Sequence, residues 1–283
     1  MIRTVYIRSV LAMVLVLTSF SLEAQEVQLH IFHTNDTHSR IEPTPKDAPK
    51  LADRAGYVRR NTFIKKMRAQ YPDLLLFDSG DYWQGTPYFN IFKGEVELKL
   101  MQEAGYDAVA LGNHEFDFGL ENIKEQFAKV NIPLLCANYD FTGTVLEGVV
   151  KPYLILKRKG LKIGVFALAP NPDGLIQKSK YKGVRYIDPI KVAQETADFL
   201  RHAGQCDMVV CLSHLGFNEP NVMGDKKLVH ETNGIDLVLG GHSHTFLAKP
   251  VLVKNKDGVD IPVSQMGKMG ASVGTITVTL DKE

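Results

Sequence analysis

Side chains of types that can bind metal ions follow five short apolar runs of this sequence. The runs cover residues 27–34, 74–77, 108–111, 208–212 and 237–239. The groups that follow them are Asp36, His38, Asp81, Asn113, His114, His214, His242 and His244. A single histidine after a strand is more often an ordinary hydrogen-bonded residue, but five of the nine histidines of the chain lie at these positions. The collective pattern predicts one polar site.

The types of these side chains indicate the kind of metal. Carboxylate, amide oxygen and imidazole without thiolate suit Mn, Zn, Fe or Co, and are too rich in nitrogen for Ca or Mg alone. The ligands are too many for one ion, whereas two ions bridged by a carboxylate would use them. Such a pair would clamp an in-line displacement at phosphorus and acidify a bound water, so that no protein nucleophile is required.

Two glycine-containing motifs are the strongest single signals. They are Gly-Asn-His-Glu at residues 112–115 and Gly-Gly-His-Ser-His at residues 240–244. Glycine lets the backbone approach a bound group closely, and buried polar side chains need partners. Taken singly, Asp36-Thr37-His38 is more readily interpreted as an Asx turn than as a metal site, and Gly80-Asp81 equally well as a tight turn. The metal hypothesis therefore rests on the whole set.

In their order along the chain, these motifs resemble the signature blocks of the calcineurin-like metallophosphoesterases. The blocks are residues 34–38, 80–81 with 85–87, 112–117, 213–214 and 240–244. The similarity is closest to the N-terminal catalytic domain of the 5'-nucleotidase family, and it extends from about residue 27 to the end of the chain. It implies a hydrolase that removes phosphate from nucleotides by attack of metal-bound hydroxide. The alternatives are a 2',3'-cyclic nucleotide phosphodiesterase, a pyrophosphatase or another phosphoesterase.

The resemblance also implies a role for each residue. One metal ion would be held by Asp36, His38, Asp81 and His244, and the other by Asp81, Asn113, His214 and His242, with Asp81 as the bridge. His114 would stay free of metal, be oriented by Asp117 and act beside the leaving oxygen as a cation or acid. Asn113 and His114 would contact the substrate. The alternative for Asp117 is an N-cap of the helix that begins near residue 120, and Glu115 has no assigned role.

Two features depart from the family pattern. Ser39 stands where the first block usually has glycine, which would alter the backbone approach or add a hydroxyl near the site. The chain ends at Glu283, about where the catalytic domain of the family ends, so we expect no C-terminal nucleotide-binding domain. The apolar groups left for a nucleoside are Tyr82, Trp83, Phe116 and Phe118, whose alternative role is core packing. The alternative from another functional class is a non-catalytic module, which would bind metal or nucleotide and act with a separate partner chain.

The elements between the motifs predict how the ligands are positioned. Helical stretches at residues 95–104, 120–130 and 190–203 alternate with the apolar runs, which is typical of an α/β fold with ligand sites at the carboxyl ends of its strands. A loop at residues 43–50 precedes a helix at residues 51–68. Residues 251–254, 261–265 and 273–280 should form antiparallel strands that close a second sheet. We expect a four-layer α/β/β/α sandwich, with two mixed sheets flanked by helices, as a single domain of residues 25–283.

The first 24 residues have the order of a cleavable secretory signal. Arg3 and Arg8 precede an apolar run at residues 10–17, and small and polar residues continue to Ala24. The run is shorter than the roughly 20 residues that span a bilayer. We therefore expect a secreted or periplasmic protein without stable membrane insertion. The formal net charge of +1 gives no basic field for a nucleic-acid polymer, so the expected ligand is a small phosphate ester, most simply a nucleotide.

Overall fold

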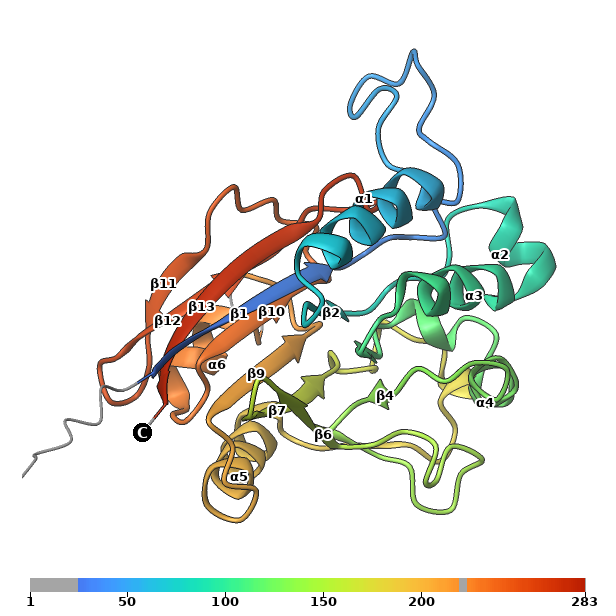
Figure 1. Cartoon of the computed structure of the whole chain (residues 1–283). Coiled ribbons are helices and arrows are strands. Elements are labelled where there is room, and N and C mark those ends of the chain that lie inside the picture. Colours follow the sequence, from blue (N-terminus) through green and yellow to red (C-terminus); the bar gives the residue numbers. More distant parts are fainter. Residues whose placement is uncertain (1–24, 219–222, 283) are drawn as a thin grey trace, which may run out of the picture.

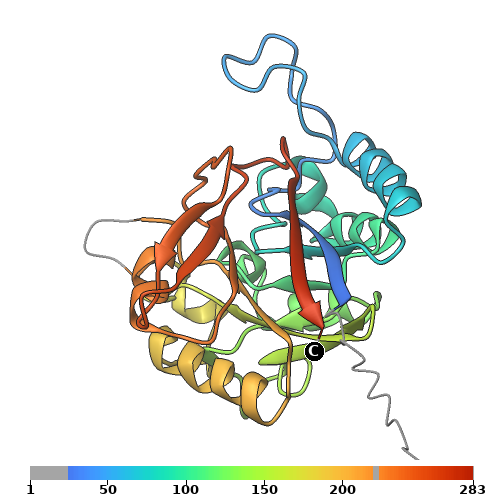
Figure 2. The same ribbon diagram turned by 60° about the vertical axis from the view of Figure 1, so that its left-hand side comes forward.

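Two β-sheets pack face to face in this protein, with helices on the outer side of each (Figure 1). The computed structural model describes residues 25–218 and 223–282. The signal peptide predicted for residues 1–24 lies outside these ranges. The segment between the first strand and the first helix projects from the rest of the molecule in both views (Figures 1 and 2).

The first sheet has five strands in the order β13-β1-β2-β3-β4. Their bounds are β1 Gln25–Thr34, β2 Leu75–Asp78, β3 Ala108–Ala110, β4 Leu134–Leu135 and β13 Gly274–Lys282. Strands β1 to β4 are parallel, and β13 is antiparallel to β1. The last strand therefore lies along the first, as both views show (Figures 1 and 2).

The second sheet has six strands in the order β11-β12-β10-β9-β7-β6. Their bounds are β6 Tyr153–Arg158, β7 Leu161–Leu168, β9 Met208–Ser213, β10 Leu237–Gly240, β11 Val251–Lys254 and β12 Asp260–Ser264. The four central strands are parallel and the two edge strands are antiparallel to their neighbours. A separate two-stranded ribbon pairs β5 Tyr139–Asp140 with β8 Arg185–Tyr186.

The apolar core lies in three layers that follow the alternation of side chains along the strands. Leu29 and Ile31 of β1 face the second sheet, where they join Ile163 and Val165 of β7 in one cluster. Side chains at the intervening positions, such as Phe166, pack outward under the helices. Because successive side chains of a strand point to opposite faces, apolar runs of this kind form a sheet that is buried on both faces.

The helices cover the two outer faces. The outer face of the first sheet packs against α1 Tyr57–Gln70, α3 Glu95–Ala104 and α4 Leu120–Phe127, and that of the second against α5 Pro189–His202 and α6 Asp225–Glu231. Shorter elements are α2 Pro87–Phe92, η1 His114–Phe116 and η2 Lys178–Lys180. Within the described ranges, no helix has both the length and the apolar character that crossing a membrane requires.

The predicted four-layer sandwich is confirmed, with three differences in detail. The helix predicted for residues 51–68 begins only at Tyr57, because Asp53 and Ala55 have left-handed φ angles of 49° and 63°. The last strand does not join β11 and β12 but pairs with β1 in the first sheet. Strand β7, which lies between β9 and β6 in the second sheet, was not among the five predicted runs because Ala169-Pro170 follow it rather than polar ligands.

Candidate dimetal site

The five loops that carry the predicted ligands all leave the carboxyl ends of parallel strands. Asp36 follows β1, Asp81 follows β2, Asn113 follows β3, His214 follows β9 and His242 follows β10, each within three residues of the strand end. Three of these strands belong to the first sheet and two to the second. The site therefore lies where the same edges of the two packed sheets meet, as expected for ligand sites of parallel sheets.

Six of the seven predicted ligands form two compact groups. The first ligand group is Asp36, His38 and His244, and the second ligand group is Asp81, His214 and His242. Within each group the potential ligand atoms all lie within 4.8 Å of one another. The Nε2 atoms of His38 and His244 are 2.9 Å apart, and Nε2 of His214 lies 3.1 Å from Oδ2 of Asp81.

The two groups adjoin each other. Oδ1 of Asp36, in the first group, lies 4.0 Å from Nε2 of His214 in the second, and the backbone amide of His242 donates to Oδ2 of Asp36 at 3.0 Å. The seventh predicted ligand, Asn113, is 7% exposed, and its Oδ1 is buried without a hydrogen-bond partner among the described residues. A buried amide oxygen of this kind needs a donor or a cation.

The geometry of His214 fits a cation in the second group. Its Nδ1 lies 2.7 Å from the carbonyl oxygen of Ser79, which can only accept, so Nδ1 carries the proton. Nε2 then faces a carboxylate oxygen of Asp81 at 3.1 Å. A proton on Nε2 or a metal cation must lie between these two atoms. A hydrogen bond from the other ring nitrogen to a carbonyl is also how metal-binding histidines are usually oriented.

The pKa shifts describe the same electrostatic situation. Burial lowers the pKa of His214, but the Asp81 and Asp36 carboxylates outweigh it and raise the pKa to about 10. Burial raises the pKa of Asp81, and the His214 charge overrides this and holds that pKa below its usual range. Burial, aided by His214, lowers the pKa of His242 to about 4. The site thus favours one positive charge beside Asp81 and a neutral imidazole at His242.

The backbone of the ligand loops is strained and closely packed. Left-handed φ angles occur at Asp36, His38, Asp81, His242 and His244, with values of 48°, 45°, 57°, 69° and 54°. Such angles persist in residues other than glycine only where the surroundings impose them, and they are concentrated at functional sites. Gly112 allows the closest approach, because a Cβ there would lie 2.2 Å from Oδ1 of Asp81.

His114 belongs to neither ligand group and lies at the open side of the site. Its side chain is 32% exposed, and its Nδ1 is 3.1 Å from Oδ2 of Asp117. Burial lowers the pKa of His114, but the Asp117 hydrogen bond and the Asp81 charge raise it above the ordinary value. The alternative N-cap role of Asp117 is wrong, since the N-cap of α4 is Gly119. The predicted pairing of His114 with Asp117 is present.

Glu115, to which the sequence assigned no role, is a central structural residue of the site. It is fully buried. Its Oε2 accepts from the amides of Gly112 and Asp81, and its Oε1 accepts from those of Tyr82 and Trp83. Burial, together with the Asp81 charge, raises its pKa, whereas the His214 charge and the amides of Gly112 and Asp81 lower that pKa and favour the carboxylate. One side chain therefore joins the loop after β2 to the loop after β3.

Ser39 has a similar connecting role on the other side of the site. Its Oγ is hydrogen bonded to Oγ1 of Thr86 at 2.6 Å and donates to Oε1 of Glu97, which is buried in α3. Oγ1 of Thr86 in turn donates to the carbonyl oxygen of Ser39 at 3.0 Å. The hydroxyl therefore ties the residue after His38 to a helix rather than facing the ligands.

The aromatic residues near the motifs serve mainly as core. Tyr82, Trp83 and Phe116 are fully buried, whereas Phe118 is 36% exposed. Of these four, only Phe118 is available to a ligand in the described structure.

Comparisons with known proteins agree with this geometry. A family model described as calcineurin-like phosphoesterase matches residues 29–246. The chain is 34% identical over 284 residues to a snake venom 5'-nucleotidase of Gloydius brevicauda. This match covers 93% of this chain and 47% of that protein.

Two solved structures are similar over most of this chain. A 5'-nucleotidase precursor from Thermus thermophilus has a TM-score of 0.82 and 32% identity, and the match covers 90% of this chain and 52% of that one. An NAD nucleotidase from Haemophilus influenzae has a TM-score of 0.81 and 29% identity, over 91% of this chain and 48% of that one. The chain spans about half the length of these relatives. Because the family model covers well over half of the chain, the protein belongs to the calcineurin-like phosphoesterase family.

Proposed function

We propose that the two ligand groups bind two divalent metal ions. Asp36, His38 and His244 hold one ion, His214, His242 and Asn113 hold the other, and Asp81 bridges them. The compact geometry of the groups supports this assignment, as do the unpartnered Oδ1 of Asn113 and the orientation of Nε2 of His214 toward Asp81. The donor set suits Mn, Zn, Fe or Co. When bound, such ions supply Lewis-acid stabilisation of a phosphoryl group and lower the pKa of water.

The reaction that this site supports best is removal of phosphate from nucleotides. The observation that carries the proposal is the position of His114, a metal-free imidazole held by Asp117 at the open side of two metal-ligand groups. With its Nδ1 hydrogen bonded to Asp117, His114 presents Nε2 to the substrate, and its raised pKa favours the protonated form. It can then donate a proton or a hydrogen bond to the leaving oxygen. Asn113 also contacts the substrate in this proposal.

The names of the relatives support the choice of substrate. They are called 5'-nucleotidases and an NAD nucleotidase. We therefore expect nucleoside 5'-monophosphates to be the best substrates, with 2',3'-cyclic nucleotides and other phosphate esters as the alternatives.

A phosphate-release assay tests this function. Purified protein is loaded with Mn, Zn, Fe or Co and offered nucleoside monophosphates, cyclic nucleotides, NAD and sugar phosphates. Nucleotide products are measured beside free phosphate, because cleavage of a cyclic phosphodiester or of the NAD pyrophosphate bond releases no phosphate. We expect release from nucleoside monophosphates, and a loss of release in His114→Ala. His230→Ala, which removes an exposed histidine of α6, is the matched control and should keep full activity. Absence of phosphate release from every nucleoside monophosphate by metal-loaded protein would overturn the proposal, and absence of any product from all substrates would favour a non-catalytic binding module.

The order of basic, apolar and small residues in the first 24 positions supports export with removal of this segment. The catalytic domain would then lie in the periplasm or outside the cell. The intact mass of protein recovered from outside the cytoplasm tests this: a chain that begins near Gln25 is expected, and a full-length chain would contradict it.

A further inference from the structure

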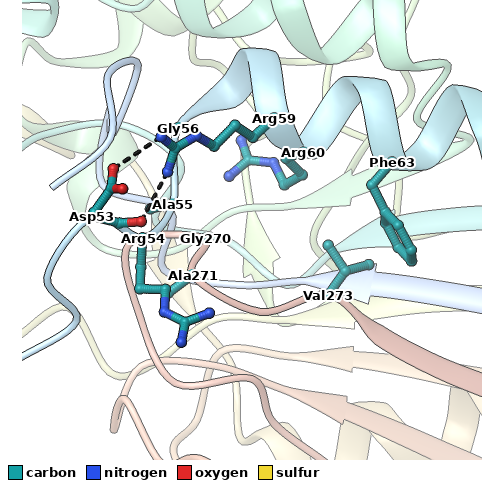
Figure 3. Close-up of a pocket in the computed structure, with 10 residues that line it drawn as sticks. All are labelled: Asp53, Arg54, Ala55, Gly56, Arg59, Arg60, Phe63, Gly270, Ala271 and Val273. Carbon is teal, nitrogen blue, oxygen red and sulfur yellow. Dashed lines mark hydrogen bonds and ion pairs between the residues drawn. The ribbon is translucent and has the colours of Figure 1, made fainter.

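A pocket lined by arginines lies at the N-terminus of α1 (Figure 3). Its volume is about 330 Å³, and none of the proposed metal ligands lines it. Arg54 comes from the projecting loop, Arg59 and Arg60 from the first turn of α1, and Gly270 from the segment before β13. The mechanism proposed above does not use any of these residues.

The helix end at this pocket is not capped by a side chain. The N-cap of α1 is Gly56, and the first turn contains no acidic residue. Neither the Val58 nor the Arg59 amide has a hydrogen-bond partner within residues 25–218 and 223–282. Free amides at the start of a 14-residue helix carry the positive end of its dipole, which attracts anions.

Arg60 adds a buried charge whose hydrogen bonds are not satisfied. The residue is 4% exposed, and its guanidinium carbon lies 3.7 Å from the centre of the Tyr57 ring. Its Nε, Nη1 and Nη2 atoms are buried and make no hydrogen bond of normal geometry in the described part of the chain, although the guanidinium group acts on the nearby Tyr106 hydroxyl. No hydrogen bond or ion pair joins Arg60 to Asp78 in the described structure, so the Asp78 carboxylate acts on it only through charge. A buried cation without hydrogen bonds is costly, so this one calls for a further anionic partner.

The charges around the pocket are unbalanced. Three guanidinium groups line it, against the single carboxylate of Asp53. Asp53 accepts from Arg59 at 2.9 Å, but both side chains of this pair are about half exposed, and such pairs contribute little. An anion that enters the pocket can therefore compete with Asp53. Figure 3 shows Phe63 and Val273 at the end of the pocket away from Asp53 and Arg54, where they form an apolar wall.

We propose that this pocket binds a small phosphorylated molecule by its phosphoryl group. Arg54, Arg59 and the free amides of α1 contact the phosphoryl oxygens, and Arg60 supplies positive charge from beneath. The apolar wall of Phe63 and Val273 receives the uncharged part of the ligand. The phosphoryl group can belong to inorganic phosphate or to a nucleotide, and the apolar wall distinguishes the two.

The pocket lies directly behind the first ligand loop without sharing its ligands. A Cβ added at Gly270 would come within 3.4 Å of Cγ2 of Thr37, between Asp36 and His38. The experiment must therefore separate phosphate bound in this pocket from phosphate bound by metal ions.

Isothermal titration of the full chain, stripped of metal on a chelating resin, makes this separation. The probes are inorganic phosphate and AMP. We expect one saturable site for at least one probe, and about a ten-fold weaker affinity in Arg54→Ala and in Arg59→Ala, since each removes charge-assisted hydrogen bonds. Arg185→Ala, which removes an exposed arginine paired with Asp140, is the control and should bind like the wild type. Both pocket variants change exposed side chains, so they should fold.

The source of the phosphoryl group follows from Phe63→Ala. Weaker binding of AMP with unchanged binding of phosphate identifies a nucleotide site, and equal binding of both probes in wild type and variant identifies a phosphate site. No saturable binding of either probe, or an equal loss in Arg185→Ala and the pocket variants, would overturn the proposal. Because the protein carries no metal in this experiment, the result is independent of the proposed phosphatase activity.

Discussion

Replacing Glu115 by glutamine tests whether one buried carboxylate organises the ligand loops. Its Oε2 accepts from the amides of Gly112 and Asp81 at 2.6 and 3.0 Å, and its Oε1 from those of Tyr82 and Trp83 at 3.1 and 3.3 Å. Glutamine keeps one oxygen and turns N–H donors toward two of these amides. Each of those amides loses its acceptor at a cost of about 1–3 kcal/mol. We therefore expect the free energy of unfolding to fall by about 2–6 kcal/mol.

Thermal unfolding of metal-free protein, followed by circular dichroism, measures this loss. In a domain of this size, 1 kcal/mol corresponds to roughly 2–4 °C in Tm, so a decrease of at least about 4 °C is expected. Metal affinity should fall as well, because two of the amides belong to Asp81 and to the residue before Asn113. Glu121→Gln changes an exposed carboxylate in the first turn of α4. As the matched control, it should change stability by less than about 0.5 kcal/mol.

Equal melting temperatures and equal metal affinities of Glu115→Gln and Glu121→Gln would refute this role of Glu115. A decrease in Tm with unchanged metal affinity would confine the role of Glu115 to stability and contradict its link to the ligand loops.

Other substitutions test the catalytic pair, the Ser39 hydroxyl and a buried histidine. His114→Ala should lower kcat by about 10²–10⁴-fold, as loss of a general acid does, without changing the metal content. Asp117→Asn should lower kcat by a smaller factor, because the imidazole remains. An unchanged kcat in both variants would exclude a catalytic role for this pair. Ser39→Ala should lower the free energy of unfolding in urea by about 1–3 kcal/mol, because the buried Glu97 loses a hydrogen-bond donor. Equal stability of variant and wild type would show that the hydroxyl is dispensable. Burial lowers the pKa of His33 to about 3. In the unfolded chain this histidine has a pKa near 6.5, so it binds a proton at a pH at which the buried side chain in the folded chain does not. The free energy of unfolding should therefore fall as the pH drops from about 6.5 to about 3, by about 2–3 kcal/mol between pH 7 and 4.5. His33→Gln should lose less stability than the wild type between these two pH values, as measured by urea unfolding. An equal loss of stability in both proteins would contradict the role of His33 in this pH dependence.

The metal-ligand loops could be predicted because their chemistry is visible in residue types. Carboxylates and imidazoles after short apolar runs, with glycines at 112 and 241, leave few alternatives once five such runs occur in one chain. The carboxyl ends of parallel strands then place these residues together without any further information.

The connecting residues could not be predicted, because their partners carry no signature in the sequence. Glu115 accepts from backbone amides, one set of which lies more than 30 residues away, and any residue type supplies an amide. Arg60 belongs to a helix rich in basic residues, where exposure is the ordinary expectation, yet it is buried. The pairing of β13 with β1 likewise depends on which sheet edge is free, and not on the local alternation of side chains.

The number of divalent cations bound per chain tests the central claim most directly. Native mass spectrometry, on protein that releases phosphate from a nucleotide, measures this number. We predict two ions per wild-type chain, and fewer than two, with loss of phosphate release, in Asp81→Asn, because Asp81 is the proposed bridge between the two ions. A fully active chain that carries one ion or none would contradict the account.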